Sequence, residues 1–208
     1  MNLEQDPHLA SRLCLDAQAR LTAAIAQLDD QTISADSLLP GWTRGHVLTH
    51  LARNADAHAR RIAGALQGQD LGKYPGGALQ RREEIEQGAA RPAADILADL
   101  THSQDKLADL MRQSDQAGWP NAHFLGGSHY GVGACPAHRL REAEMHHVDL
   151  GIGYTPTDWP SDYVAWEMTY LLPSVEERLH DPGQRASMLA WLAGRGPAEH
   201  TWQLDPWG

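Results

Sequence analysis

The sequence predicts a mainly α protein, and three observations indicate this fold class. Apolar residues recur at helical spacing through several long segments, which is the pattern of helices that bury one face. Glycine and proline gather between these segments, where they interrupt helices. With 208 residues, 42% of them hydrophobic, the chain can bury a substantial core.

The first two helices follow from their spacing and from the signals at their ends. Alanine and leucine repeat at helical spacing from about His8 to Asp29, and a turn-rich connection follows from Ser34 to Gly41. Thr43 is a good N-cap for a second helix that runs to about Gln67, because its hydroxyl can accept a hydrogen bond from a free backbone N–H. The segment from Gly68 to Gly77 then ends this helix.

Two more helices and a long loop are expected in the middle of the chain. A shorter helix covers Ala78 to Gln87, and a long helix begins at Pro92, a residue favoured in the first turn. Gln113 to Ala134 is then expected to be a loop. We interpret this loop as a lid or a pocket wall because it is long and carries Trp119, His123, Phe124, His129 and Tyr130.

The last third of the chain is again predicted to be mainly helical. Pro136 opens a helix that Gly151 and Gly153 close. Further helices are expected from Ser161 to about His180 and from Gln184 to Ala193. Thr201 to Leu204 is interpreted either as a short strand or as an extended tail.

The helix that follows Pro136 carries a polar face with the residues of a metal site. Arg139, Glu142, His146 and Asp149 follow one another at steps of three, four and three, so all four share one face. A carboxylate and an imidazole one turn apart can bind the same divalent metal, and the arginine and aspartate are left to orient or neutralise the site. A solvated helix face with the same spacing is the alternative.

A second polar stripe on the Thr43 helix supplies the third ligand. His46, His50, Asn54 and His58 recur every four residues, opposite a side that carries apolar residues. One histidine of this stripe together with Glu142 and His146 makes three ligands, which is the number found in catalytic zinc sites that keep an open position. For His46 and His58, a surface helix with several histidines is the alternative.

Three segments resemble the mycothiol-dependent maleylpyruvate isomerase family, which belongs to the DinB/YfiT-like metal-binding bundles. They are Leu39 to Ala52, Leu140 to Gly151 and Trp191 to Gly196. The resemblance implies a DinB-like four-helix bundle with a short carboxy-terminal α(+β) extension, divided as residues 1–155 and 156–208. It implies a divalent metal, usually zinc, on His50, Glu142 and His146. Members of the family usually carry a longer carboxy-terminal domain than the Arg185 to Gly208 segment of this chain.

The resemblance also implies a reaction, the cis–trans isomerisation of maleylpyruvate to fumarylpyruvate in gentisate catabolism. A low-molecular-weight thiol adds to the double bond, the resulting single bond rotates, and the thiol leaves. Mycothiol, glutathione, cysteine and bacillithiol present the same sulfur, so the thiol is left open. Two alternatives remain: a thiol S-transferase that joins the thiol to an electrophile, and a non-catalytic metal-binding bundle.

A dicarboxylate substrate needs cations, and three arginines are candidates for catalytic residues. Arg139 and Arg53 each lie three residues from a proposed metal ligand. Arg195 is the candidate near the carboxyl end, because in the family an arginine from that region reaches back to the metal pocket. Arginine suits this role because its planar fork matches a carboxylate. A surface ion pair or a helix-end cation is the alternative for each.

Composition narrows the expected partners to small molecules. The formal net charge of −10 disfavours nucleic-acid binding and means that an acidic substrate needs a local basic pocket. No apolar run approaches the ~20 residues that span a bilayer. The acidic amino terminus lacks the features of a secretory signal, and Cys14 and Cys135 are too few for a disulfide scaffold. We therefore expect a cytoplasmic protein without a membrane partner, and we allow for a homodimer.

Overall fold

The computed structural model describes residues 2–120, 130–198 and 202–205. The chain divides into two compact units, of which the first ends at Tyr163 and the second begins at Val164. The predicted domain boundary between residues 155 and 156 stays a prediction. None of the helices in the described ranges is both long enough and apolar enough to cross a membrane.

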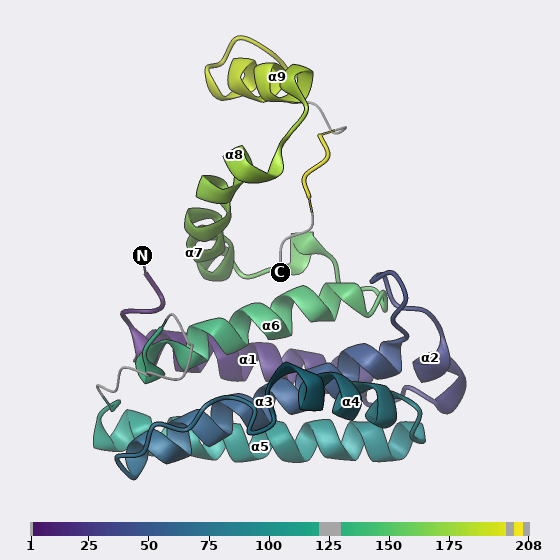
Figure 1. Cartoon of the computed structure of the whole chain (residues 1–208), viewed down its shortest axis with the longest axis vertical. Coiled ribbons are helices and arrows are strands. Elements are labelled where there is room, and N and C mark those ends of the chain that lie inside the picture. The colour runs from purple at the N-terminus through teal and green to yellow at the C-terminus, as the bar shows by residue number, and fades with distance from the viewer. Residues whose placement is uncertain (1, 121–129, 199–201, 206–208) are drawn as a thin grey trace. The chain divides into compact units, whose positions relative to one another are not determined.

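The first unit is a four-helix bundle, as predicted (Figure 1). Two of its long helices, α1 and α6, pack together, and the other two, α3 and α5, form the second pair. The short helix α4 lies against α3. The bounds are α1 Pro7–Ile25, α2 Asp30–Ser34, α3 Arg44–Leu66, α4 Gly77–Ala89, α5 Ala93–Ala117 and α6 Cys135–Asp149, with 3-10 turns at Val132–Ala134 and Pro156–Asp158.

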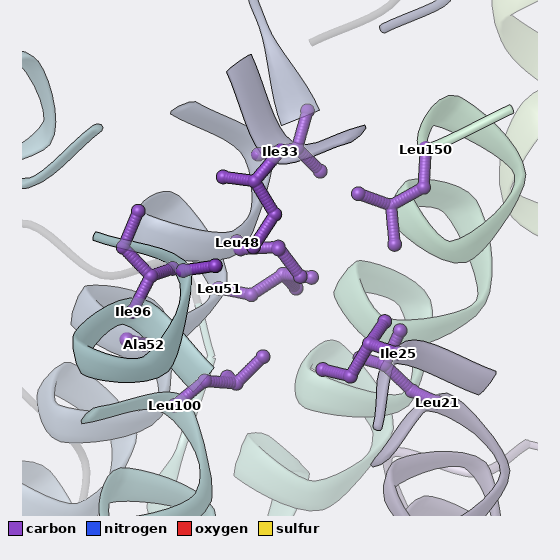
Figure 2. Packing of buried hydrophobic residues seen from close by; sticks show 11 residues of the cluster. Leu21, Ile25, Ile33, Leu48, Leu51, Ala52, Ile96, Leu100 and Leu150 are labelled. Carbon is purple, nitrogen blue, oxygen red and sulfur yellow. The ribbon is translucent and has the colours of Figure 1, made fainter. Parts of the chain in front are cut away.

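The core of this unit lies where α1, α2, α3 and α5 meet the end of α6. Figure 2 shows its apolar side chains converging from these helices. Its members include Leu21, Ile25, Ile33, Leu48, Leu51, Ile96, Leu100 and Leu150. Burial of each large aliphatic side chain contributes about 1.5–3 kcal/mol. The apolar sides of α3 and α5 therefore face this core, as their spacing predicted.

Helix ends account for most differences from the sequence-based expectations. The first helix ends at Ile25 rather than near Asp29, because the Asp29 side chain accepts from the backbone N–H of Thr32 and caps the unpredicted helix α2. The helix α5 continues to Ala117, which shortens the predicted loop, and Gly118 then ends the helix with φ 87°. His123, Phe124 and His129 of that loop lie outside the described residues.

The second unit is also helical in its described part. It contains most of α7 Ser161–Leu171, followed by a 3-10 turn Leu172–Ser174, α8 Val175–Arg178 and α9 Pro182–Leu192. One helix was expected from Ser161 to His180, but Pro173 has no N–H to donate and interrupts it. Within the described ranges no strand is found, and Trp202 to Asp205 has no regular secondary structure. Thr201 lies outside these ranges.

Candidate metal centre

The structure brings His50 of α3 together with Glu142 and His146 of α6. The Nε2 atom of His50 lies 2.9 Å from Oε2 of Glu142, and the Nε2 atom of His146 lies 3.4 Å from the same oxygen. The candidate ligand atoms of the three residues all lie within 4.8 Å of one another. We call these three residues the triad. They are the set that the sequence predicted as metal ligands.

The way α3 begins explains why His50 joins the triad and His46 does not. Thr43 caps the helix, and its side chain accepts from the backbone N–H of His46. The Nδ1 atom of His46 in turn accepts from the backbone N–H of Thr43 at 3.1 Å, which completes a capping box. The ring of His46 is therefore used by the helix end, and His50 one turn later faces α6.

The charges of the triad are strongly coupled through the shared carboxylate. Burial would raise the pKa of Glu142, but hydrogen bonds from His146 and His50 hold it well below its usual value. Burial lowers the pKa of His50, against the opposing hydrogen bond to Glu142. For His146, burial is outweighed by its hydrogen bonds to Asp149 and Glu142, which raise its pKa to about 9. Glu142 is therefore a carboxylate, ready to accept a metal or a proton.

A second group of residues orients the two imidazoles. Oδ2 of Asp149 lies 2.8 Å from Nδ1 of His146, as expected for an aspartate that holds a histidine with its Nε2 turned to a metal. Nδ1 of His50 lies 2.9 Å from Nη2 of Arg81 on α4. The ring of Trp42 meets His50 edge-on, with 5.7 Å between ring centroids. Asp149 was predicted in this role, whereas Arg81 was not identified from the sequence.

The triad has ligand types that zinc accepts, and one of its spacings matches tetrahedral zinc. Zinc bonds of 2.0–2.1 Å in tetrahedral geometry separate neighbouring ligand atoms by about 3.3 Å, close to the 3.4 Å between His146 Nε2 and Glu142 Oε2. Two nitrogens and one oxygen leave a position for an external ligand. The side chains of His146 and Glu142 are 19% and 27% exposed, so the triad is not fully enclosed by the described part of the chain.

The three predicted arginines lie in different surroundings. Arg139 is fully buried: its Nη1 donates to the Leu51 carbonyl and to Asn54 Oδ1, both at 2.9 Å, whereas Nη2 has no hydrogen-bond partner. Arg53 is paired with Asp56 at 3.0 Å and Asp99 at 2.6 Å. These contacts show that Arg139 supports the fold and that the charge of Arg53 is neutralised.

Arg195 belongs to the second unit, where its Nη1 donates to the carbonyl of Ala193 directly after α9. This contact fits the alternative role of a cation at a helix end. A role of Arg195 in the active site stays a prediction.

The two cysteines are buried thiols. Cys14 and Cys135 are both free and fully buried. Burial raises the pKa of Cys14 to about 12 and that of Cys135 to about 11. At neutral pH both are therefore protonated, and neither has the thiolate character of a nucleophile.

Comparison with known proteins agrees with this geometry. Residues 14–151 match the family described as the mycothiol maleylpyruvate isomerase N-terminal domain. A crystal structure of the mycothiol-dependent maleylpyruvate isomerase has a TM-score of 0.77 and 22% identity, covering 94% of this chain and 93% of that one. A second structure is of a variant of that enzyme with one histidine replaced by alanine. It has a TM-score of 0.75 and 24% identity, covering 82% of this chain and 72% of that one.

These structural likenesses establish the shared fold. No curated protein matches the chain significantly. The family match spans both polar helices and all three members of the triad. The chain therefore belongs to the mycothiol maleylpyruvate isomerase family, whose N-terminal domain it carries.

Proposed function

We propose that this protein is a metal- and thiol-dependent cis–trans isomerase that converts maleylpyruvate to fumarylpyruvate, with the metal held by His50, Glu142 and His146. The observation that carries the proposal is the triad itself, in which two imidazole nitrogens and a carboxylate oxygen lie within 4.8 Å of one another in a chain of this family. Three ligands with an open position are the mark of a catalytic rather than a structural zinc site.

The metal, which we propose to be zinc, supplies one of two effects when bound: it stabilises the thiolate of the thiol, or it polarises the substrate carbonyl. The residues of the chain prepare the site for either effect. Asp149 fixes the ring of His146 with Nε2 turned to the triad, and the pKa of Glu142, held well below its usual value by the neighbouring imidazoles, makes this residue a carboxylate before the metal binds.

The proposed reaction needs no oxidant or reductant. The thiolate sulfur adds to one carbon of the cis double bond, and a proton is taken up by the rest of the conjugated system. The former carbon–carbon double bond is now single and rotates. Loss of the proton and of the same thiol then restores the double bond in the trans geometry. The thiol is regenerated, so it acts as a cofactor. A place in gentisate catabolism and in the cytoplasm is part of this proposal, and the two free cysteines support a reducing compartment.

Cations for the substrate carboxylates remain part of the proposal. Arg139 has one buried nitrogen without a partner and is the best placed of the three predicted arginines. Arg53 is already paired with two aspartates, which weakens its case. If Arg195 binds a carboxylate, Arg195→Lys should lower kcat/KM by about ten- to a hundred-fold with unchanged metal content, because lysine lacks the two-donor fork.

The decisive assay follows the absorbance of maleylpyruvate with metal-loaded protein and each thiol in turn. We expect isomerisation with one thiol, its loss on chelation and its return on addition of zinc. Consumption of the thiol with formation of a stable conjugate would replace this proposal by the S-transferase alternative. Retention of the metal without any reaction would favour a binding protein.

A further inference from the structure

A continuous line of polar side chains runs between α3 and α6, starting at the triad. On α3 it consists of His50, Asn54 and His58, each one turn after the last. On α6, Glu142 contacts His50 and Arg139 contacts Asn54, so the two helices run antiparallel along this line. We call these five residues the polar seam. Two members of the triad, His50 and Glu142, form one end of the seam, and His58 forms the other.

The His58 end of the seam holds buried ring and guanidinium nitrogens for which the described part of the chain offers no hydrogen-bond partner. His58 is fully buried, and neither of its ring nitrogens has a hydrogen-bond partner. Nη2 of Arg139, one turn along the seam, is also buried without a partner. A buried polar group left without a partner costs about 1–3 kcal/mol, and native proteins seldom keep one unless it serves a purpose.

Lys73 adds a third donor to this region. It lies in the segment between α3 and α4 and is partly buried, and within the described residues it has no hydrogen bond and no ion pair. Its Nζ lies 5.3 Å from the centre of the Tyr130 ring. Burial lowers the pKa of Lys73, and the charge that opposes this most strongly is Glu142. Lys73 is thus close enough to the triad to sense its carboxylate.

Lys73 and Arg139 are also the strongest charges acting on His58. Burial lowers the pKa of His58 well below its usual value, and the positive charges of Lys73 and then Arg139 lower it further. Glu142 acts in the opposite direction, and His138 adds to the lowering. Of the other carboxylates nearby, Glu4 is engaged by His138 at 2.9 Å and Asp56 by Arg53 at 3.0 Å. The region is therefore rich in donors and poor in acceptors, which is the environment an anion requires.

The geometry points to a carboxylate-binding subsite formed by His58, Lys73 and Nη2 of Arg139, next to the metal triad. We infer that it binds one carboxylate of the small dicarboxylate substrate while the reacting end lies at the triad. Lys73 and Arg139 supply charge, and the neutral ring of His58 supplies one N–H donor. That the bound dicarboxylate is the substrate rests on the proposed function. That the subsite binds a dicarboxylate does not depend on it.

The test is a calorimetric titration of the metal-loaded protein with succinate, a dicarboxylate that has no double bond to isomerise. We expect Lys73→Met to weaken succinate binding by about ten- to a hundred-fold, the value of one charge-assisted hydrogen bond, and His58→Leu to weaken it in the same direction. Arg60→Met is the matched control, because this α3 cation donates to the Gly72 carbonyl outside the seam. Metal content should be unchanged in all three variants.

The results of these experiments decide whether the subsite exists and which ligand it binds. Failure of the wild-type protein to bind succinate, or equal binding by Lys73→Met, would overturn the subsite. Should His58→Leu fail to fold, Lys73→Met still gives the answer. In turnover assays, Lys73→Met should raise the KM for the substrate and leave the KM for the thiol unchanged, and the reverse would assign the subsite to the thiol. Succinate binding without turnover would contradict the proposed function and leave the subsite standing.

Discussion

The two ends of the polar seam use the same kind of residue in opposite ways. His50 and His58 lie on the same face of α3 and are both buried, with 4% and 0% of their surface exposed. Both ring nitrogens of His50 have partners, Glu142 and Arg81, whereas those of His58 have none among the residues that the structure describes. The two ends therefore differ in partners and not in burial.

The difference lies in the sign of the surrounding charge. Two carboxylates, Glu142 and Asp149, serve the histidines of the triad end, whereas Lys73 and Arg139 are the strongest charges on His58. A negatively charged cluster of ligands suits a cation, and a buried cluster of donors suits an anion. The proposed metal centre and the proposed subsite would thus be two unlike half-sites along one helix pair, and we propose that a keto dicarboxylate uses both.

The largest expected effect is a loss of stability in acid, and it separates histidines whose pKa is lowered by burial from His146, whose pKa is raised by hydrogen bonds to Asp149 and Glu142. Burial lowers the pKa of His147 to about 4 and that of His138 to about 3, and it also lowers the pKa of His58. Because these groups take up protons on unfolding, their contribution is complete above pH 6.5 and is lost as the pH falls toward 4.

Between pH 7 and pH 5 we expect the melting temperature to fall by more than about 10 °C. Each proton taken up on unfolding lowers the free energy of unfolding by about 1.4 kcal/mol per pH unit, and a loss of 1 kcal/mol lowers the melting temperature by about 2–4 °C. His146 acts with the opposite sign: its pKa is raised to about 9, so its contribution is complete below pH 6.5 and is lost as the pH rises through 9. Thermal melts of the metal-free protein across this range test both signs, and a flat profile would refute them.

The next effect concerns Arg139, which lies between the two ends. Arg139→Met removes the hydrogen bonds to Leu51, Asn54 and Gln18, so we expect the free energy of unfolding to fall by about 3 kcal/mol. Urea unfolding measures this loss. An unchanged midpoint together with lost activity would instead make Arg139 purely a substrate-binding residue.

A smaller effect is expected where Asp149 orients His146. Asp149→Asn keeps the shape but weakens the contact to Nδ1, so metal affinity should fall by about 10- to 100-fold. Glu144→Gln on the same helix is the control, because Glu144 pairs with Arg20 and Tyr154 away from the triad. Competition with a chromophoric chelator measures both. Equal losses in the two variants would show a general effect on α6.

The smallest effect is a gain of stability at the unpartnered end. His58→Leu replaces a buried ring without partners by an apolar side chain, so the free energy of unfolding at pH 7 without ligands should rise by about 1 kcal/mol. Functional sites often keep such unfavourable groups, and their removal often stabilises a protein. A clear loss of stability in urea unfolding would contradict this expectation and show that the His58 ring makes a stabilising contact in the folded protein.

Helical spacing was sufficient to predict most of the bundle and the two polar stripes from which the triad comes. The stripes on α3 and α6 each place their polar residues on one face, and the apolar residues opposite build the core. Spacing within α3 left open which histidine of its stripe joins Glu142 and His146, and only the family resemblance pointed to His50. In the structure, the capping box at Thr43 and the packing of α3 against α6 separate His50 from His46.

Residues contributed by other elements could not be predicted in this way. Arg81 reaches His50 because α4 packs on α3, and Lys73 lies in a segment that the sequence identifies only as a break. Neither contact leaves a periodic signal in the chain, because it depends on how two elements meet. The interruption at Pro173, in contrast, could have been predicted from the sequence, because a proline inside a helical pattern is sufficient reason to end a helix there.

The most direct test of the central proposal is the metal content of two variants one helical turn apart. Elemental analysis of the wild-type protein should give about one divalent metal per chain, as a three-ligand site requires. His46→Ala should retain this metal, because His46 caps α3, and His50→Ala should lose most of it while remaining helical by circular dichroism. Full retention of metal by His50→Ala, or its loss only in His46→Ala, would contradict the proposed centre.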